Sequence, residues 1–409
     1  MPSRTHMSGG GYRAGMEYDV PVVVVGINPT ALGIVRSLHP HCQTIIAVES
    51  NRDEPGTHTR LARVHLIDDL SDHETLMAEL VDLARTFNER PVLFLPSDEH
   101  VLWAVRNREG LSAHYRLLLP TREVCETLMF KDRFSELAAR EHLPMPRSAF
   151  LPLDGLAGQI AEAGLRYPVI LKPANKTGAW EQQGLDKAYI VDGPDEATAV
   201  AARVGATVPA VLAQEYLAGE DGQVYFCLYL AAPGLEPLLF VGRKLLQWPP
   251  LRGSTAACEP AEAPGLEVFT RRLFQGLGVE GFASLEVKYD NTGAFKIIEP
   301  TIGRVDLQSQ LATLNGMNMP LCGYLAALGR HEEAKAFGRQ IRSDVVWVYE
   351  ASMWSLWRTH SLDGTSLLGL ARRPKGYALA SWSDPGVLGA FAGGVIERAA
   401  RKARSLVTF

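Results

Sequence analysis

The chain has 409 residues, enough for two or three packed domains, and 46% hydrophobic with 21% charged residues is ordinary for a globular protein. A net charge of −5 gives no overall support for binding to nucleic acid or to a membrane surface. The five cysteines lie far apart without a Cys-x-x-Cys pair, which favours a reduced, cytoplasmic protein with inert thiols.

The N-terminal part begins with a stretch rich in glycine, serine and methionine, so residues 1–18 are expected to form a flexible leader. Strand-like and helix-like segments then alternate as far as residue 120: strand 22–26, helix 30–38, strand 44–48, helix 74–88 and strand 92–95. This alternation predicts a parallel, doubly wound sheet. Residues 19–125 are therefore expected to form a Rossmann-like domain.

The turn after the first strand half-resembles a dinucleotide fingerprint, with Gly26 and Gly33 in place and Glu49 about 20 residues further on. However, Asn28 occupies the second glycine position, where the backbone has to approach a pyrophosphate closely. A plain Rossmann-like layer whose strand ends hold a substrate is therefore favoured over a nicotinamide site. Asp98 follows the third strand on the same rim, where the simpler interpretation is the start of a helix.

The pattern changes after Thr121, which is a plausible N-cap for a helix. Lys131 opens a further helix, and the apolar strand 167–173 places Lys172 near its end, where a lysine either snorkels or holds an anion. The polar loop 174–187 contains Lys176 and suits a mobile flap over phosphate, although a flexible surface loop explains it equally well.

The next segments alternate between strands and helices and end with a run of strands. They are strand 188–191, helix 194–204, strand 211–217 with a polar turn after it, strands 223–230 and 238–246, a small-residue loop at 253–255, and helix 264–277. The strand at 238–246 carries Arg243 and Lys244, and the polar turn carries Glu220 and Asp221.

A hairpin is predicted over residues 282–299, because two short apolar runs flank the turn residues Asp-Asn-Thr-Gly at 290–293. If Tyr289 pairs with Ala294, Glu286 lies opposite Ile297, and Glu299 lies one diagonal step away on the same face. The other face then carries three core residues: Leu285, Val287 and Ile298.

Two carboxylates on one face of a sheet repel each other unless a positive group lies between them. A hard cation with oxygen ligands is one explanation for Glu286 and Glu299. The alternative is an exposed hairpin face on which Lys288 and Lys296 balance the acids. The hairpin by itself leaves both open.

Taken in order, these motifs resemble the ATP-grasp superfamily, in its branch of ATP-dependent carboxylate–amine ligases. The resemblance rests on Lys131 at a helix start, PVILKPA with Lys172, QEYLAG from Gln214, and Glu286 and Glu299 thirteen residues apart. The segment GRKLLQWPP from Gly242, the run EPTIGR that ends at Arg304, and Asp384-Pro385 look like the D-aspartate ligase-like subgroup.

The resemblance implies an α/β protein with an α+β ATP-grasp domain over residues 126–330. It follows the Rossmann-like N-terminal domain and precedes a small mixed α/β appendage over residues 331–409. Further implications are a cytoplasmic enzyme, no nucleic-acid or membrane partner, and a homodimer as one assembly.

For the nucleotide, the resemblance implies that Lys131 and Lys172, with Lys176 in the loop, neutralise the phosphates of ATP. The main chain of Glu215, Tyr216 and Leu217 would pair with the adenine edge, and the Gln214 side chain would reach its amino group. Asp221 or Glu220 would accept hydrogen bonds from the ribose.

For the metal, the resemblance implies that Glu286 and Glu299 hold one or two Mg²⁺ ions, with Mn²⁺ as an alternative metal. Thr301 stands where asparagine is usual, so a weaker or water-completed second site is expected. Arg304, together with Arg243 or Lys244, would stabilise the transferring phosphoryl group and the tetrahedral intermediate.

The implied reaction joins a carboxylate to an amine through an acyl phosphate and releases ADP and phosphate. Both substrates are expected to be small and amino-acid-like, bound by the segments 26–33, 97–100 and 304–310. Three alternatives stay open: an ATP-grasp enzyme with a thiol or another non-amine acceptor, a nicotinamide-dependent oxidoreductase built on the N-terminal layer, and a nucleotide-binding protein without catalysis.

Overall fold

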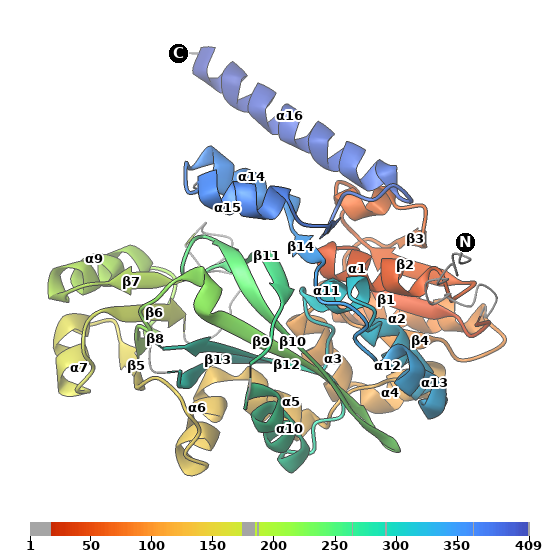
Figure 1. Ribbon diagram of the computed structural model, residues 1–409, viewed down its shortest axis with the longest axis horizontal. Helices are drawn as coiled ribbons and strands as arrows, with labels where there is room; N and C mark the ends of the chain where they lie inside the picture. The colour runs from red at the N-terminus through yellow and green to blue at the C-terminus, as the bar shows by residue number, and fades with distance from the viewer. Residues whose placement is uncertain are drawn as a thin grey trace, which may run out of the picture.

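Three β-sheets organise the chain (Figure 1). The computed structural model describes residues 18–173, 185, 188–263, 265–290, 293–362 and 364–407. The expected leader, apart from its last residue, and nearly all of the expected loop 174–187 with Lys176 lie outside these ranges.

The N-terminal sheet is parallel throughout, as the alternation of strands and helices predicted. Its order is β3-β2-β1-β4, and its strands are β1 (Val22–Val25), β2 (Ile45–Glu49), β3 (Arg63–Leu66) and β4 (Val92–Phe94). Helices α1 (Pro29–Leu38), α2 (His73–Arg85), α3 (Asp98–Arg106) and α4 (Arg108–His114) accompany it. The edge strand β3 was not predicted, because it is short and has no fully buried residue.

A seven-stranded sheet forms the centre of the molecule, in the order β13-β12-β9-β10-β11-β14-β15. Its strands are β9 (Val224–Ala232), β10 (Leu235–Trp248), β11 (Ser254–Pro260), β12 (Gly281–Tyr289), β13 (Phe295–Ile302), β14 (Val346–Val348) and β15 (Lys375–Tyr377). One face shares a core with β1 and helix α12 (Met319–Ala327), and the other packs on α10 (Leu266–Gly276) and α5 (Arg122–Met129).

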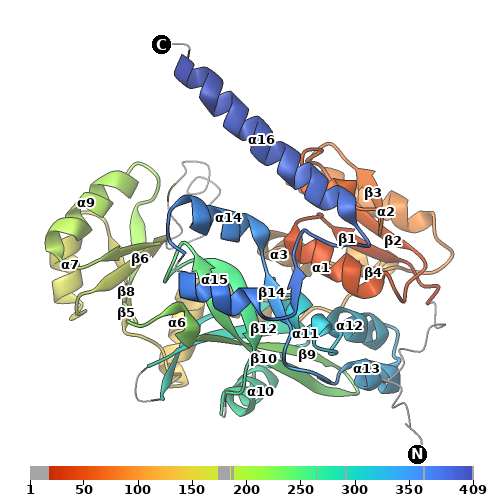
Figure 2. The same ribbon diagram turned by 45° about the horizontal axis from the view of Figure 1, so that its top comes forward.

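The smaller four-stranded sheet has the order β5-β8-β6-β7 and is antiparallel. It comprises β5 (Ser148–Pro152), β6 (Val169–Pro173), β7 (Tyr189–Val191) and β8 (Ala210–Glu215). Helices α7 (Leu156–Glu162) and α9 (Pro194–Val204) share a separate core with it, and Figures 1 and 2 show this unit projecting from one side of the central sheet.

Several local predictions are confirmed. The hydroxyl of Thr121 caps α5 by accepting from the amide of Val124 at 3.3 Å, and helix α6 (Lys131–Arg140) begins at Lys131. One local prediction was wrong: β11 begins at Ser254, where a loop was expected. Its small residues are buried between β10 and β14, and the small side chains had hidden the strand pattern.

The C-terminal part is joined to both the central sheet and the N-terminal layer. Strands β14 and β15 extend the central sheet. The helices of this part are α11 (Ser309–Leu314), α13 (His331–Phe337), α14 (Glu350–Arg358), α15 (Gly364–Ala371) and α16 (Pro385–Val407). Two short 3-10 helices lie earlier in the chain, η1 (Pro55–His58) and η2 (Asp221–Gln223). Helix α16 touches η1 near its N-terminal end and then runs away from the body (Figure 2). Among the described residues no helix is both long enough and apolar enough to cross a membrane.

Asp384 fastens this C-terminal segment to the N-terminal layer. Its carboxylate is fully buried and accepts from the Thr59 hydroxyl at 2.8 Å and from the Arg60 amide at 3.0 Å. Arg36 lies 3.7 Å away and donates to the carbonyls of Ala378 and Leu379. A buried carboxylate with three partners is costly to remove, because the Thr59 hydroxyl and the Arg60 amide then lose their acceptor and Arg36 loses its counter-charge.

We expect Asp384→Ala to lower the free energy of unfolding by about 3 kcal/mol, since it leaves Arg36 buried without its carboxylate. Urea unfolding followed by circular dichroism measures this. Asp82→Ala is the matched control, because Asp82 is 74% exposed and pairs with the exposed Arg85. Equal stabilities for the two variants would contradict the role given to Asp384.

Candidate active site

A cavity of about 320 Å³ opens between the N-terminal layer and the central sheet. The three segments expected to bind substrate all contribute to it, through Thr30, through Ser97 and Asp98, and through residues 304, 306, 307 and 308. Four carboxylates and two cations line it, together with several hydroxyl groups. Its size and polarity suit a small, charged molecule.

Glu286 and Glu299 lie directly opposite each other on β12 and β13, and both line this cavity. The expected register was wrong by one residue at Tyr289, which pairs with Phe295, and by two residues at Glu286, because a β-bulge at Ile298 separates the Val287–Ile297 pair from the Glu286–Glu299 pair. The bulge turns the Glu299 side chain to the same face of the sheet as Glu286. The Cβ atoms of two residues paired in this way are about 5 Å apart.

The same bulge decides which isoleucine enters the core. Ile297 is fully buried and packs with Leu285 and Val287, whereas Ile298, which was expected there, is only partly buried. Thr301 pairs with Ser284 on the strand next to it, two residues beyond Glu299, and it too lines the cavity. The two carboxylates and one hydroxyl thus share one face of the hairpin.

Lys244 supplies the positive charge beside this pair. It is 3% exposed, and its Nζ donates to Glu286 Oε1 at 2.8 Å and to Gln247 Oε1 at 3.2 Å. The alternative was an exposed face on which Lys288 and Lys296 balance the acids; of these two lysines, Lys288 is directed elsewhere, because its Nζ donates to the carbonyl of Gly219 at 3.0 Å. The balancing cation comes from a strand two places away in the sheet.

Arg243 lies on the opposite face of the sheet, because successive side chains of a strand point to opposite faces. Its Nε donates to Glu259 Oε1 at 2.6 Å, and Arg373 pairs with the other oxygen of Glu259. Burial raises the pKa of Glu259, but the two guanidinium groups outweigh it and hold this pKa below its ordinary value. The structure thus brings Lys244, and not Arg243, to the carboxylate pair.

Arg304 connects the cavity to the N-terminal layer. Its Nε donates to Asp98 Oδ1 at 2.5 Å, and its side chain is 17% exposed. Burial lowers the pKa of Arg304, but Asp98 and Asp306 together raise it above its ordinary value. Asp98 was interpreted as a helix-start acid; it does open α3, and it also orients Arg304.

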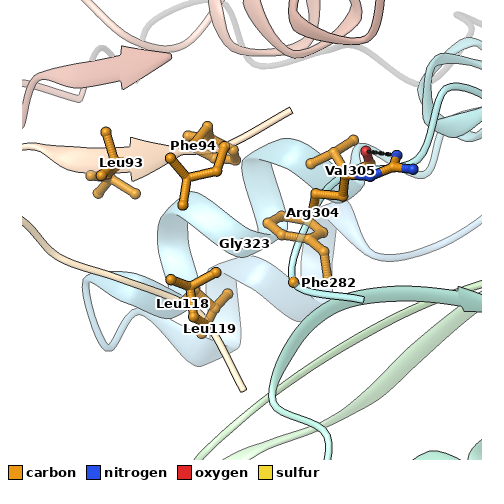
Figure 3. Close-up of a pocket in the computed structure, with 11 residues that line it drawn as sticks. Leu93, Phe94, Leu118, Leu119, Phe282, Arg304, Val305 and Gly323 are labelled. Atoms are coloured by element: carbon orange, nitrogen blue, oxygen red, sulfur yellow. Dashed lines mark hydrogen bonds between the residues drawn. The ribbon is translucent and has the colours of Figure 1, made fainter. Parts of the chain in front are cut away.

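The stem of Arg304 borders a second, apolar cavity of only about 10 Å³, too small for a substrate. Figure 3 shows Phe94, Leu118 and Phe282 around it, with the guanidinium of Arg304 turned away from them toward the carbonyl of Val305. This packing fixes the stem and leaves the charged end at the larger cavity.

Of the two lysines expected at the nucleotide phosphates, Lys131 contacts the end of β6, and Lys172, which lies on β6, contacts the neighbouring strand β8. Lys131 Nζ donates to the carbonyl of Pro173 at 2.6 Å, and Lys172 Nζ donates to Gln214 Oε1 at 3.1 Å. Gln214 is 5% exposed and holds Lys172 in place. The expected contribution of Lys176 lies outside the described residues.

The segment expected to bind adenine follows directly after β8. The amide of Glu215 donates to Arg147 and its carboxylate accepts from Arg166, while the amide of Tyr216 donates to Pro168. Lys288 lies over the Tyr216 ring at 5.2 Å. Leu217 follows them outside any strand.

Asp221 already has protein partners for both of its oxygens. They accept from the amide and the side-chain amide of Gln247, at 2.7 and 2.8 Å, and from the amide of Leu251 at 2.8 Å. Asp221 therefore shapes the turn after β10. Glu220 is the exposed acid of the two.

Glu49 and Asn28 have structural uses in the N-terminal layer. Glu49 is 6% exposed and accepts from the amides of Ile27, Ser50 and Asn51 at 2.8 to 3.0 Å. The Asn28 side chain caps α1 through the amide of Ala31 at 3.0 Å. The acid that a dinucleotide site would offer to a ribose is thus used to close the turn.

Four polar residues that were not predicted from the sequence lie at the cavity or against it: Thr255, Ser284, Asp306 and Gln308. Ser284 donates to Asp306, and Gln308 donates to Thr255 at 2.8 Å. The segment 304–310 had been named only as a region, and nothing in the motif distinguishes these side chains from ordinary loop residues.

Comparison with models of protein families gave no match, and comparison with the sequences of curated proteins gave none either. Solved structures do match. Biotin carboxylase from Campylobacter jejuni, in complex with β,γ-ATP, has a TM-score of 0.58 and 15% identity over 76% of this chain and 71% of its own.

Two further matches are similar in extent. L-amino acid ligase from Bacillus licheniformis has a TM-score of 0.57 and 15% identity over 82% of this chain and 79% of its own. The third match is the biotin carboxylase domain dimer of Hydrogenobacter thermophilus 2-oxoglutarate carboxylase, in complex with MgADP and bicarbonate. It has a TM-score of 0.55 and 16% identity over 75% of this chain and 69% of its own. The chain has the fold of these proteins, which is the ATP-grasp fold that the sequence motifs predicted.

Proposed function

We propose that the protein is an ATP-dependent carboxylate–amine ligase that forms an amide bond through an acyl phosphate and releases ADP and phosphate. One observation carries the proposal above the others: Glu286 and Glu299 face each other across β12 and β13, at a cavity that Lys244 and Arg304 also line. This arrangement has two acids for a metal and two cations for anionic oxygens.

The fold supports the proposal. The structures with the same fold include an L-amino acid ligase and biotin carboxylases solved with ATP-like ligands or with MgADP. Biotin carboxylase and amino acid ligases differ in what they join, so the fold alone does not name the substrates.

For the nucleotide, Lys131 and Lys172 supply positive charge beside β6, where phosphates would lie. The main chain of Glu215 and Leu217 would pair with the adenine edge, next to the Gln214 amide. Since Asp221 is held by Gln247, Glu220 is the better candidate for the ribose.

The carboxylate pair fits a hard divalent cation, because it offers two oxygen ligands opposite each other. Among the residues that the structure describes, no group of three or more His, Cys, Asp and Glu is placed to hold a metal. Phosphate and water oxygens would therefore complete the shell, with Thr301 as a weak extra donor. Mg²⁺ bound there, or Mn²⁺ in its place, would shield the charge of the triphosphate.

The chemistry then needs two groups from this chain at the reacting atoms. A substrate carboxylate oxygen bonds to the γ-phosphorus and the bond to ADP breaks. The nitrogen of the neutral amine then bonds to the acyl carbon, phosphate leaves, and the nitrogen loses one proton, which the departing phosphate takes up. Lys244 and Arg304 line the cavity, and there they would stabilise the negative charge that builds up on oxygen in both steps. Arg243, on the other face, has no part in this proposal.

The N-terminal layer does not favour a nicotinamide site, since Glu49, the acid that would hold the ribose, is bonded to three backbone amides. A thiol or another non-amine acceptor uses the same ATP site and stays an alternative. All five cysteines are buried and free, which supports the proposed cytoplasmic location, and the homodimer stays a prediction.

The proposal is tested by incubating the protein with ATP, Mg²⁺ and a panel of acids and amines. Release of ADP and phosphate that depends on both an acid and an amine is expected. Release of AMP would rule out the acyl phosphate, and tight ATP binding without turnover would favour a binding protein without catalysis.

We expect Glu299→Ala to abolish ADP formation, with turnover at least about 1000-fold lower, because it removes one of the two carboxylates from the metal. Omission of Mg²⁺ should have the same effect on the wild-type protein. Glu267→Ala is the control, since Glu267 is 56% exposed on α10 and pairs with Arg271. Near-normal turnover of Glu299→Ala would mean that the metal site lies elsewhere.

The neighbours Lys244 and Arg243 give a matched pair on one strand. We expect Lys244→Met to slow ADP formation about 100-fold, because one cation at the reacting oxygens is lost. Arg243→Met should leave the rate almost unchanged, since Arg243 lies on the opposite face and Glu259 keeps Arg373. The steady-state rate of ADP formation is measured for both variants. If Arg243→Met were the slower of the two, the chemistry would lie on the other face of the sheet.

A further inference from the structure

Gln247 is buried beside Lys244, near the end of the strand that carries both residues. It is 3% exposed, and its Oε1 accepts from Lys244 Nζ at 3.2 Å. In a regular strand, two residues three positions apart point to opposite faces of the sheet. The pairing of β10 with β11 is irregular at two places between Lys244 and Gln247, which allows both side chains to lie on the same face. Bulges of this kind redirect side chains next to active sites.

Asp221 fixes the direction of the Gln247 side-chain amide. The Nε2 atom of this amide donates to Asp221 Oδ1 at 2.8 Å, and the backbone amide of Gln247 donates to Oδ2 at 2.7 Å. A carboxylate only accepts hydrogen bonds and an ammonium only donates them. A flipped amide would therefore turn its oxygen to Asp221 and its NH₂ group to Lys244, and both bonds would be lost. The Gln247 oxygen is thus held toward the lysine.

The Lys244 ammonium has three N–H donors, and two of them have partners among the described residues. Glu286 Oε1 accepts at 2.8 Å and Gln247 Oε1 accepts at 3.2 Å. Two bonds fix the rotation of the ammonium about its Cε–Nζ axis, so the direction of the third donor is fixed as well. Because Lys244 lines the cavity, this third donor is the one that remains for an oxygen of a ligand.

Gln247 also keeps Lys244 from pairing with Glu286 alone. Without the Gln247 oxygen, Glu286 would be the only hydrogen-bond partner of Lys244 among the residues that the structure describes. The ammonium would then turn toward this carboxylate, and both groups would be less available to a metal and to a substrate oxygen. A neutral acceptor suits this role, because it holds the ammonium without adding a negative charge that would offset the positive one.

We propose that Gln247 is a positioning residue of the ligase: its amide, directed by Asp221, holds the Lys244 ammonium between Glu286 and the reacting oxygens. Gln247 acts through Lys244 and touches no substrate. The inference rests on the proposed ligase activity and adds a residue to it. Its physical basis is preorganisation, since a donor that is already in place when negative charge develops needs no reorientation during the reaction.

A double-mutant cycle tests whether Gln247 acts through Lys244. The turnover number for ADP formation is measured at saturating substrate for the wild type, Gln247→Met, Lys244→Met and the double variant. Gln247→Met keeps the length of the side chain and removes the amide, and it should slow ADP formation about tenfold, as expected for one hydrogen bond. In the Lys244→Met background the same change should cause no further loss.

Two results of this cycle would overturn the proposal: losses that multiply in the double variant, or wild-type turnover of Gln247→Met. If Gln247→Met does not fold, Gln247→Leu, which also lacks the amide, takes its place with the same expectations. Gln43→Met is the control, because Gln43 is exposed and likewise donates its Nε2 to an aspartate, Asp19, at 2.7 Å. It should turn over as the wild type does.

Gln247→Glu separates the two hydrogen bonds of the amide. The glutamate still accepts from Lys244, but it cannot donate to Asp221. It should therefore form ADP faster than Gln247→Met. A slower rate than that of Gln247→Met would show that the bond to Asp221 matters and the bond to Lys244 does not, which contradicts the positioning role.

A readout without turnover separates this role from the ligase activity itself. The NMR signal of the Lys244 ammonium, identified by its loss in Lys244→Met, should shift in Gln247→Met and stay in place in Gln43→Met. This shift without ADP release by the wild type would overturn the ligase and keep the contact that holds Lys244. ADP release that depends on an acid and an amine, with an unshifted signal and unchanged turnover in Gln247→Met, would keep the ligase and overturn the positioning role.

Discussion

The repulsion between Glu286 and Glu299 constrains the architecture around it. Two carboxylates directly opposite on adjacent strands are unfavourable, and the bulge at Ile298 brings them into this position instead of avoiding it. Lys244 from β10 offsets part of the repulsion at 2.8 Å, which requires β10 to lie within reach of β12 on the same face. The order of strands in the central sheet, the bulge and the buried lysine are therefore parts of one electrostatic arrangement.

The cavity exists because two layers with separate sequence patterns are held against each other. A shared core joins β1 and α1 to the central sheet, and Asp384 with Arg36 fixes the C-terminal segment to the same layer. Arg304 and Asp98 then form an ion pair across the boundary, with their charged ends at the cavity. The contacts that hold the N-terminal layer against the central sheet therefore also shape the wall of the cavity, so a change that weakens these contacts alters both the stability of the fold and the binding of a ligand.

The sequence predicted the features that depend on local pattern: the parallel N-terminal layer, the start of α6 at Lys131 and the hairpin with its two acids. It could not predict the bulge, because a one-residue insertion in pairing leaves the alternation of residues nearly unchanged. The sequence likewise could not tell which of Arg243 and Lys244 faces the carboxylate pair, because this depends on how β10 is placed in the sheet. Asp306 and Gln308 were missed for another reason: they lie in a loop without a recognisable pattern, and only the packed structure places them at the cavity.

Lys288 links the segment expected to bind adenine to the strand that carries Glu286. It lies on β12 two residues from Glu286 and is 5% exposed; its Nζ donates to the carbonyl of Gly219 at 3.0 Å and lies over the ring of Tyr216. Burial lowers its pKa from the ordinary value, while Asp221 partly opposes this effect. A displacement of the segment 216–219 must therefore either break this bond or pull on the strand that carries Glu286, so that the proposed adenine contact and the carboxylate pair form one mechanical unit.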